Sequence, residues 1–448
     1  MGNRFDHSDT GNAELLVSMY GKNTRYDSST ARWLQWRDTH RWYEIDRTTQ
    51  YEMAINTANY RFESAKSLND TEDIKREVLF GIKSRDLRRL ENMLTIAENL
   101  RPIGGHGIAW DSYPNLLAVD NGVIDLQTGS FKSGARTDYI STGLSIPYIP
   151  HSPCPRWERF ITEICCGDTE LSSFIQRAIG YTLSGYVREH VFFLLYGSGG
   201  NGKSVLVNAL GHLLAGFSRT IRFTAFEENG TTDAKRDLAE LPGVRATFAS
   251  EGAELKGLDT AMIKQITGGE PITTSKKYGH PFTYKPQFKL WLTTNHLPRI
   301  DDDSYGFWRR VILIPFNAKF EGAARENDLE DKLIKELPGI LAWAVEGAKA
   351  WFKSGLSTPD SLLLQIQSYR QAEDEIENFI LDCCQLSPHL KEKASQLYSA
   401  YVTWKIAKHE RPLSSTLFGR RLNSKYEKEH DRTGWWYQGL ALDTRIKV

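Results

Sequence analysis

The stretch VFFLLYGSGGNGKSVLVNALGHLL, residues 191–214, runs from an apolar segment through a glycine-rich turn into a helical pattern. Residues 191–196 are apolar or aromatic throughout, which indicates a buried strand. The turn, GSGGNGKS at 197–204, matches G-x-x-x-x-G-K-[ST] in full. Residues 203–214 then repeat apolar side chains at helical spacing. A strand, a glycine-rich loop and a helix in this order predict an α/β core whose loop holds an anion.

The spacing within the loop has a physical reason. Glycine permits tight turns in which successive N–H groups point at one anion, and the following helix adds its positive end. In this pattern Lys203 reaches the outer phosphates of a nucleoside triphosphate, and the Ser204 hydroxyl ligates Mg²⁺. With ATP and Mg²⁺ as cofactors, the predicted binding residues are Gly197, Ser198, Gly199, Gly200, Asn201, Gly202, Lys203, Ser204 and Val205.

Two later strands end in polar residues. The buried run 244–249 leads to Glu251, with Glu254 close behind, and the apolar run 288–294 leads to Asn295. Because ligands bind at the carboxyl ends of parallel strands, these side chains are candidates for catalysis. We expect the acid to polarise the attacking water or hold the Mg²⁺ shell, and Asn295 to touch the γ-phosphate or its water. Which acid is catalytic, Glu251 or Glu254, stays open.

Two arginines, Arg309 and Arg310, stand directly before the apolar strand that follows in YGFWRRVILIPF. A buried guanidinium needs an anionic partner, and a nucleotide site in a neighbouring subunit would supply one. We expect Arg309 to act as an arginine finger and Arg310 to support it.

Length and composition bound the organisation. A chain of 448 residues predicts two or three domains. The formal net charge is zero, but residues 271–300 carry five Lys or Arg and no Asp or Glu, and residues 401–448 carry ten against five. The proline-rich PHSPCPRW and the linker-like GLSTPDS predict domains at 1–150, 151–356 and 357–448. The first reads as α+β, with hairpins around Asp38-Thr39 and Asn121-Gly122.

The five cysteines, Cys154, Cys165, Cys166, Cys383 and Cys384, fit neither a zinc pattern nor a disulfide framework. They indicate buried thiols in a reducing compartment. The N-terminus lacks a signal-peptide pattern, and no apolar run approaches membrane-spanning length. We therefore expect no membrane partner and a cytoplasmic location, that of a bacterial host.

The order of these motifs resembles the superfamily-3 helicases, and in particular the helicase part of phage, plasmid and poxvirus primase-helicases. The matching segments are the glycine-rich loop, ASEGAE, IKQITGGEPITTSKKYGHPFTYKPQFKLWLTTNHLP and FWRRVILIPF, preceded by DTGNAELLVSMYG and DSYPNLLAVDNGVIDLQTG. The resemblance implies an AAA+-type ATPase, a hexameric ring and 3′-to-5′ translocation on single-stranded DNA. The sequence departs from this family in two ways. The family's acidic motif often has two adjacent carboxylates, whereas Glu251 and Glu254 are separated by two residues. Few residues precede DTGNAE, so we expect no primase domain in this chain; either a separately encoded protein is the primase, or the chain is a fragment of a longer primase-helicase.

Two segments are expected to contact DNA. ITTSKKYGHPFTYKP predicts a hairpin whose tip carries Lys276, Lys277, Tyr278 and His280, with lysines gripping phosphates and an aromatic ring stacking on a base. The resemblance carries Lys276 and Lys277 over as DNA contacts. It also marks Lys264, which contacts either DNA or a neighbour's nucleotide.

The C-terminal segment predicts a winged-helix-like fold. An amphipathic helix, KASQLYSAYVTWKIAK, precedes LSSTLFGRRLNSKY, and GWWYQGLAL supplies wing-like strands. We expect the second helix, capped by Ser414 or Ser415, to present Arg420, Arg421 and Lys425 on its outer face toward DNA.

These patterns favour an ATP-driven replicative DNA helicase of a phage, plasmid or other mobile element, acting on single-stranded and forked DNA as a homo-oligomer. A nucleotide-gated origin initiator or loader without processive unwinding is the alternative. A small-molecule kinase accounts for the glycine-rich loop but not for the paired arginines, the lysine hairpin or the basic C-terminal segment.

Overall fold

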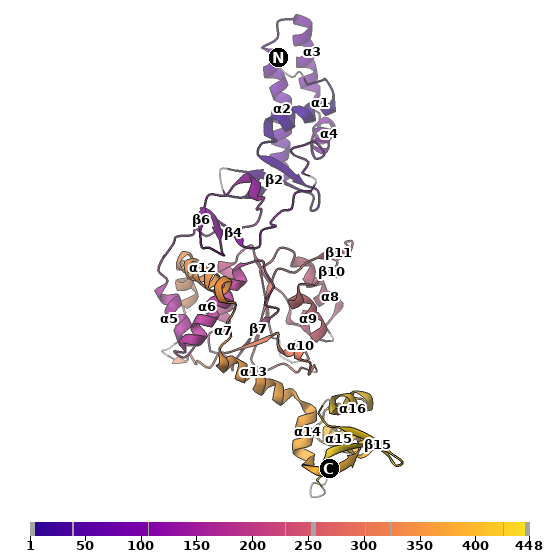
Figure 1. Ribbon diagram of the computed structural model, residues 1–448. Coiled ribbons are helices and arrows are strands. Elements are labelled where there is room, and N and C mark those ends of the chain that lie inside the picture. The colour runs from indigo at the N-terminus through magenta and orange to yellow at the C-terminus, as the bar shows by residue number, and fades with distance from the viewer. Residues whose placement is uncertain are drawn as a thin grey trace.

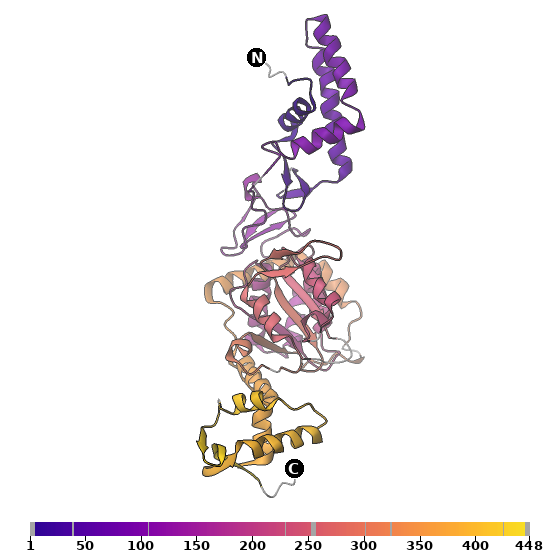
Figure 2. The same ribbon diagram turned by 90° about the vertical axis from the view of Figure 1, so that its right-hand side faces the viewer.

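A computed structural model describes residues 5–37, 40–105, 107–228, 230–251, 257–300, 302–322, 325–423 and 425–443. Three units follow one another along an elongated molecule, with the two chain ends at opposite extremes (Figure 1). The orthogonal view shows the same linear arrangement (Figure 2). The glycine-rich loop belongs to the middle unit, so this unit is the one that positions the candidate site.

The N-terminal unit combines helices with two small antiparallel sheets. Its helices are α1 (Asp9–Tyr20), α2 (Arg47–Ala65), α3 (Thr71–Lys83) and α4 (Leu87–Ala97), and its strands are β1 (Thr24–Asp27), β2 (Arg32–Trp36), β3 (Trp42–Glu44), β4 (Leu116–Val119), β5 (Gly122–Asp125) and β6 (Phe131–Lys132). Both predicted hairpins are present as β2–β3 and β4–β5. Asp38 and Thr39, the predicted turn of the first, lie outside the described residues. Gly122 already pairs with Val119, so the second turn is Asp120-Asn121.

The middle unit is a five-stranded parallel sheet, which confirms the predicted α/β class. Its strands are β7 (Phe192–Tyr196), β8 (Ser218–Thr220), β9 (Ala246–Ser250), β12 (Lys289–Thr294) and β13 (Val311–Pro315), in the spatial order β13-β7-β12-β9-β8. Most of their side chains are buried, as expected for strands covered on both faces. Because all five strands are parallel, their carboxyl ends share one edge.

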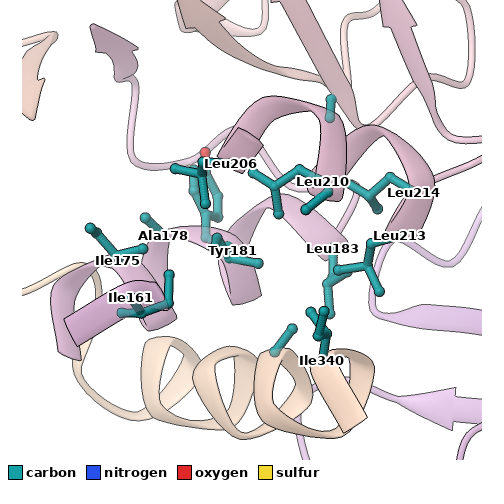
Figure 3. Close-up of a cluster of buried hydrophobic side chains, with 14 of the residues drawn as sticks. Ile161, Ile175, Ala178, Tyr181, Leu183, Leu206, Leu210, Leu213, Leu214 and Ile340 are labelled. Atoms are coloured by element: carbon teal, nitrogen blue, oxygen red, sulfur yellow. The ribbon is translucent and has the colours of Figure 1, made fainter. Parts of the chain in front are cut away.

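Helices flank the sheet and build the core. They are α5 (Pro155–Ile164), α6 (Thr169–Leu183), α7 (Lys203–Leu213), α8 (Thr232–Lys235), α9 (Thr260–Gly268), α10 (Tyr305–Trp308), α11 (Leu329–Lys335) and α12 (Leu337–Ser354), with short 3-10 turns at Phe223–Phe226 and Arg236–Glu240. Leu206, Leu210 and Leu213 of α7 lie among buried side chains of α5, α6 and α12 (Figure 3). This packing fixes the helix that follows the glycine-rich loop.

Two buried cations, Arg245 and Lys289, lie at the amino ends of the strands, the edge of the sheet opposite to the glycine-rich loop. Arg245, before β9, donates to the carbonyls of Leu183 at 2.6 Å and Leu116 at 2.8 Å, so it joins α6 to the N-terminal unit. Burial lowers the pKa of Arg245 to about 10. Lys289, at the start of β12, donates to the carbonyls of Ser184 and Gln287, and burial lowers its pKa well below the ordinary value. The carbonyls at the end of α6 thus solvate both charges.

A short hairpin projects from the middle unit, as predicted. It consists of β10 (Ile272–Thr274) and β11 (Phe282–Tyr284), which pair antiparallel. The Tyr284 hydroxyl donates to the Leu238 carbonyl at 2.7 Å and anchors the base of the hairpin. The tip lies in solvent: Tyr278 is 97% exposed.

The last unit begins after a connecting helix. Helix α13 (Asp360–Glu373) follows the predicted linker and packs on the middle unit through buried Tyr369, whose ring meets Trp308 edge-on at 5.2 Å. The compact unit beyond it contains α14 (Glu375–Cys383), β14 (Cys384–Lys393), α15 (Ala394–Ala407), α16 (Ser415–Asn423), β15 (Lys428–Asp431) and β16 (Gly434–Leu442), with sheet order β14-β16-β15. Leu397, Tyr401 and Trp404 of α15 are buried in its own core, as the amphipathic pattern predicts.

The five cysteines are free thiols. Burial raises the pKa of Cys154 to about 12 and that of Cys165 to about 11, so both stay protonated at neutral pH. Cys166 is exposed and Cys384 is half-buried, contrary to the expectation that all five are buried. Within the described ranges, no helix is both long and apolar enough to cross a membrane.

The packing of α6 against α12 generates a stability prediction. A Cβ on Gly347 would lie 2.1 Å from the Gln176 carbonyl oxygen, so the two helix backbones touch. We expect Gly347→Ala to lower the free energy of unfolding by about 1–3 kcal/mol, because helices must separate to admit the methyl group. Gly211→Ala in α7 is the control: a Cβ there meets nothing within 4 Å, and the change should raise stability by up to about 1 kcal/mol. Urea unfolding followed by circular dichroism measures both, and equal stabilities would contradict the close helix contact.

Candidate functional site

The loop between β7 and α7 has the backbone of an anion cradle. Gly199, Gly200 and Gly202 have φ values of +84°, +61° and +91°, which explains why glycine occupies these positions. The N–H groups of residues 203–205 open helix α7 and donate to no acceptor in the described part of the chain. Ser198 and Ser204 are exposed beside them, and Val205 is half-buried. The loop therefore offers unsatisfied donors to a negatively charged ligand.

Two buried loop residues hold this backbone in place. The Asn201 side chain is 2% exposed and donates to the Phe316 carbonyl at 2.9 Å, at the end of β13. The Lys203 ammonium is also buried and donates to the carbonyl of Gly197 and to Asn201 Oδ1 at 3.2 Å. Burial lowers the pKa of Lys203, and the nearby charge of Glu251 opposes this shift. The ammonium is thus fixed under the loop.

The Asn295 amide contacts Lys203 at the carboxyl edge of the sheet, and the Glu251 carboxylate lies next to Asn295. Strand β12 lies between β7 and β9, so Asn295 stands between the loop and Glu251. Lys203 Nζ donates to Asn295 Oδ1 at 3.1 Å. The Asn295 N–H donates to Glu251 Oε2 at 2.8 Å, and the Thr294 hydroxyl donates to the same oxygen. The structure therefore joins Lys203, Asn295 and Glu251 in one hydrogen-bonded chain, whereas Glu254 lies outside the described residues.

The donor set fits a triphosphate with Mg²⁺. Open N–H groups and an ammonium suit phosphate oxygens, and the exposed Ser204 hydroxyl with the Glu251 carboxylate suits a hard cation. No group of three or more His, Cys, Asp or Glu side chains that could hold a metal ion occurs among the described residues. In this arrangement phosphate oxygens would complete the shell of the cation.

Arg309 and Arg310 lie at the other edge of the sheet. Val311 pairs with Phe192 and Pro315 with Tyr196, so the arginines precede the strand end that is farthest from the loop. Five residues at about 3.3 Å each separate the two edges by roughly 15 Å. Arg310 donates to Thr267 Oγ1 at 3.1 Å and to the Gly306 carbonyl, so neutral oxygens replace the anion that we expected. Arg309 is exposed and pairs with no described residue.

The residues of the middle unit that we expect to contact DNA lie in two separate places, the hairpin tip and helix α9. Lys276, Lys277, Tyr278 and His280 are exposed at the hairpin tip, where Lys276 forms a 3.5 Å ion pair with Glu240 and Lys277 lies 5.4 Å from the Tyr278 ring centroid. Lys264 pairs instead with Asp302 at 2.5 Å and donates to Ser304. Asp302 was not predicted from the sequence, because its partner Lys264 is distant in the chain.

The prediction that α16 presents Arg420, Arg421 and Lys425 on its outer face is only partly correct. Arg420 is exposed. Arg421 is turned inward, with its side chain 11% exposed, and pairs with the buried Glu375 at 3.0 Å. Lys425 pairs with Asp374 at 2.5 Å and with Glu377 at 2.7 Å. The cations are turned toward α14 because its buried or half-buried carboxylates need partners, a constraint that the sequence of α16 alone does not contain.

Other functional contacts were also absent from the sequence predictions. The Thr294 hydroxyl orients Glu251, and Asn201 has a structural role within the loop rather than only a binding role. A strand-terminal threonine directly before Asn295 was the available signal for the first.

The role of Asn201 can be tested without any ligand. Asn201→Ala leaves the buried Phe316 carbonyl without its donor, so we expect the free energy of unfolding to fall by about 1–3 kcal/mol. Asn208→Ala is the control, because Asn208 is exposed and its side chain donates, among the described residues, to Glu330 alone, at 3.2 Å. Thermal unfolding measures both variants. An unchanged melting temperature for Asn201→Ala would show that the amide does not hold the loop.

Two family descriptions match parts of the chain. Residues 13–166 match the family described as "D5 N terminal like". Residues 195–310, which include the candidate site, match a family of unknown function, DUF5906.

Curated relatives come from large DNA viruses. "Putative helicase L207/L206" of Acanthamoeba polyphaga mimivirus is 28% identical over 420 residues, which cover 83% of this chain and 42% of that protein. "Putative helicase 121R" of Invertebrate iridescent virus 3 is 28% identical over 229 residues, covering 48% of this chain and 24% of that protein. The chain thus spans less than half the length of these relatives. The apo structure of the NrS-1 C-terminal region has a TM-score of 0.49 at 11% identity, covering 96% of this chain and 99% of that chain. The chain is therefore similar to viral proteins that carry helicase names.

Proposed function

We propose that this chain is an ATP-dependent DNA helicase motor of the superfamily-3 type, with an AAA+-type core. In this proposal the chain works as a ring, a hexamer as in that family, and the ring moves 3′ to 5′ on single-stranded DNA. The observation that carries the proposal is the chain Lys203–Asn295–Glu251 at the carboxyl edge of the sheet. It brings a cation for phosphates, an amide and a carboxylate together beside open loop N–H groups.

Each side chain has a role in this proposal. Lys203 and the loop N–H groups bind the phosphates of ATP, and Ser204 with Glu251 holds Mg²⁺, which neutralises charge on the transferred phosphoryl group. Glu251, oriented by Thr294, accepts a hydrogen bond from the attacking water, and Asn295 positions that water or the γ-phosphate. Lys203 is already buried and oriented, so its charge is in place before the reaction.

The position of Arg309 supports a multi-subunit site. At roughly 15 Å from the loop edge, measured along β13 at about 3.3 Å per residue, its guanidinium cannot complete the site of its own chain. An exposed arginine at that edge suits the nucleotide of an adjacent protomer. Arg310 fixes the segment through Thr267 and Gly306 and so acts as a positioning residue.

DNA would be held by two parts of the chain. The hairpins of the protomers would line the channel of the ring with Lys276, Lys277, Tyr278 and His280. Strands β14, β15 and β16 with helices α14, α15 and α16 have the order of a winged helix, with α16 in the place of the recognition helix and Arg420 as its exposed cation.

A mixing experiment tests the proposal. We expect Lys203→Ala to abolish ATP hydrolysis and Arg309→Ala to preserve ATP binding while lowering turnover by at least about a thousandfold, the scale of an arginine finger. Mixed in equal amounts, the two proteins should regain activity, because some interfaces combine an intact loop with an intact arginine. Arg88→Ala, an exposed arginine of α4, is the control and should retain turnover. Retained hydrolysis in Lys203→Ala refutes the proposal, and turnover without displacement of a forked duplex favours an initiator or loader instead.

The proposed contact between the hairpin and DNA should make the affinity for single-stranded DNA depend on salt concentration. Each phosphate contact on a single strand contributes about 0.7 to the slope of log affinity against log salt, so Lys276→Ala combined with Lys277→Ala should flatten that slope by about 1.4. As the control, Lys335→Ala combined with Lys353→Ala removes one exposed lysine from α11 and one from α12, and the slope should stay unchanged. Fluorescence anisotropy with labelled oligothymidylate at several salt concentrations measures both. Identical slopes would exclude the hairpin as the grip.

A further inference from the structure

The sheet of the C-terminal unit carries an aromatic ring on the face that turns away from its core. Tyr437 of β16 is 1% exposed and belongs to the core, and its neighbour Trp436 does not. Side chains alternate between the faces of a strand, so Trp436 lies on the outer face. Its cross-strand neighbours are Lys393 on β14 and Glu429 on β15. The Trp436 side chain is half-buried.

Two lysines flank the ring. Lys391 Nζ lies 5.0 Å and Lys393 Nζ 5.3 Å from the Trp436 ring centroid. Neither ammonium forms an ion pair or hydrogen bond with a residue that the structure describes. Two other lysines of this unit differ: Lys405 pairs with Glu375 at 2.8 Å, and Lys408 pairs with Asp382 at 2.9 Å. Trp436, Lys391 and Lys393, called here the outer-face patch, thus hold two cations without carboxylate partners.

The nearby carboxylates are already engaged by neutral donors. Glu392 accepts from the N–H groups of Lys393 at 3.0 Å and Leu442 at 3.2 Å. Glu429 accepts from the Gln438 amide at 2.8 Å. Asp431 accepts from the N–H and hydroxyl of Thr433, and these hydrogen bonds, with a smaller contribution from the charge of Lys391, hold its pKa at about 2. No carboxylate of the described residues forms an ion pair with Lys391 or Lys393, so both ammoniums can bind an anion from outside the chain.

We propose that the outer-face patch binds single-stranded DNA, with one base stacked on Trp436 and the adjacent phosphates held by Lys391 and Lys393. The indole face can stack only on a base whose own face is free, which duplex DNA provides only at its ends. A stacking base replaces the ammoniums over the ring, and each ammonium then moves to a phosphate on its side. The inference extends the proposed function to a second single-strand contact, remote from the hairpin, and needs no ATP turnover.

Full-length protein without nucleotide provides the test. In a chain that already carries Lys276→Ala and Lys277→Ala, we expect Trp436→Ala to weaken binding of labelled oligothymidylate on the order of tenfold, the scale of one lost stack. Trp436→Phe should retain most of the affinity, because the smaller ring still stacks. Lys391 is exposed and Lys393 is half-buried. Lys391→Gln combined with Lys393→Gln should lower the salt dependence without affecting the fold, as circular dichroism would verify.

Three comparisons make the result decisive. Lys408→Ala removes an ammonium that lies 4.1 Å from the Trp404 ring but is paired with Asp382, and Tyr60→Ala removes a 50% exposed ring in α2; neither should change affinity. Trp435→Ala removes an indole on the opposite face of β16 and should weaken binding less than Trp436→Ala does. Unchanged affinity in both the Trp436 and the double-lysine variants overturns the proposal. So does an equal loss for duplex and single strand, or a larger loss for Trp435→Ala. Retained hydrolysis in Lys203→Ala would refute only the motor proposal, so the two proposals fail separately.

Discussion

A buried ammonium must be surrounded by oxygen atoms, and in this chain that requirement organises the site around Lys203. Its partners come from the loop itself and from Asn295, one strand away. The arrangement requires β12 to stand next to β7, which the sheet order provides. Asn295 in turn donates its N–H to Glu251 beyond it. The charge of one lysine thus links three strand ends, and the apolar packing of α7 against α5, α6 and α12 keeps that lysine in place.

Local patterns predicted the parts of the molecule that depend on neighbouring residues in the chain. The strand and helix on either side of the glycine-rich loop, the hairpin at 272–284 and the buried stripe of α15 follow from glycine conformation and from the alternation of apolar side chains. The placement of Asn295 and Glu251 at the same edge followed from one rule about parallel strands. That β12 separates β7 from β9 did not follow, because strand order depends on packing between distant segments.

The partners of charged side chains within the chain could not be predicted where they lie far away in the sequence. Arg421 has the spacing of an exposed recognition-helix cation, yet the buried carboxylate of Glu375 turns it inward. Lys264 likewise meets Asp302, and Arg310 is satisfied by a hydroxyl and a carbonyl. Helix α13 shows the same limit at the level of domains, since Tyr369 packs it on the sheet unit although the linker-like segment precedes it. A linear pattern states which side chains need partners but not which partners they find.

The hairpin tip illustrates how stability and use can oppose each other at one residue. Tyr278 has a φ of +65°, a conformation that costs a residue with a side chain about 1 kcal/mol or more, and its ring gains nothing from burial. A glycine there would relieve the backbone and make the hairpin easier to form. Such a replacement would also delete the most exposed aromatic surface of the middle unit. Selection for stability alone would therefore replace this tyrosine. If related proteins retain it, the ring is retained for a contact that it makes with another molecule.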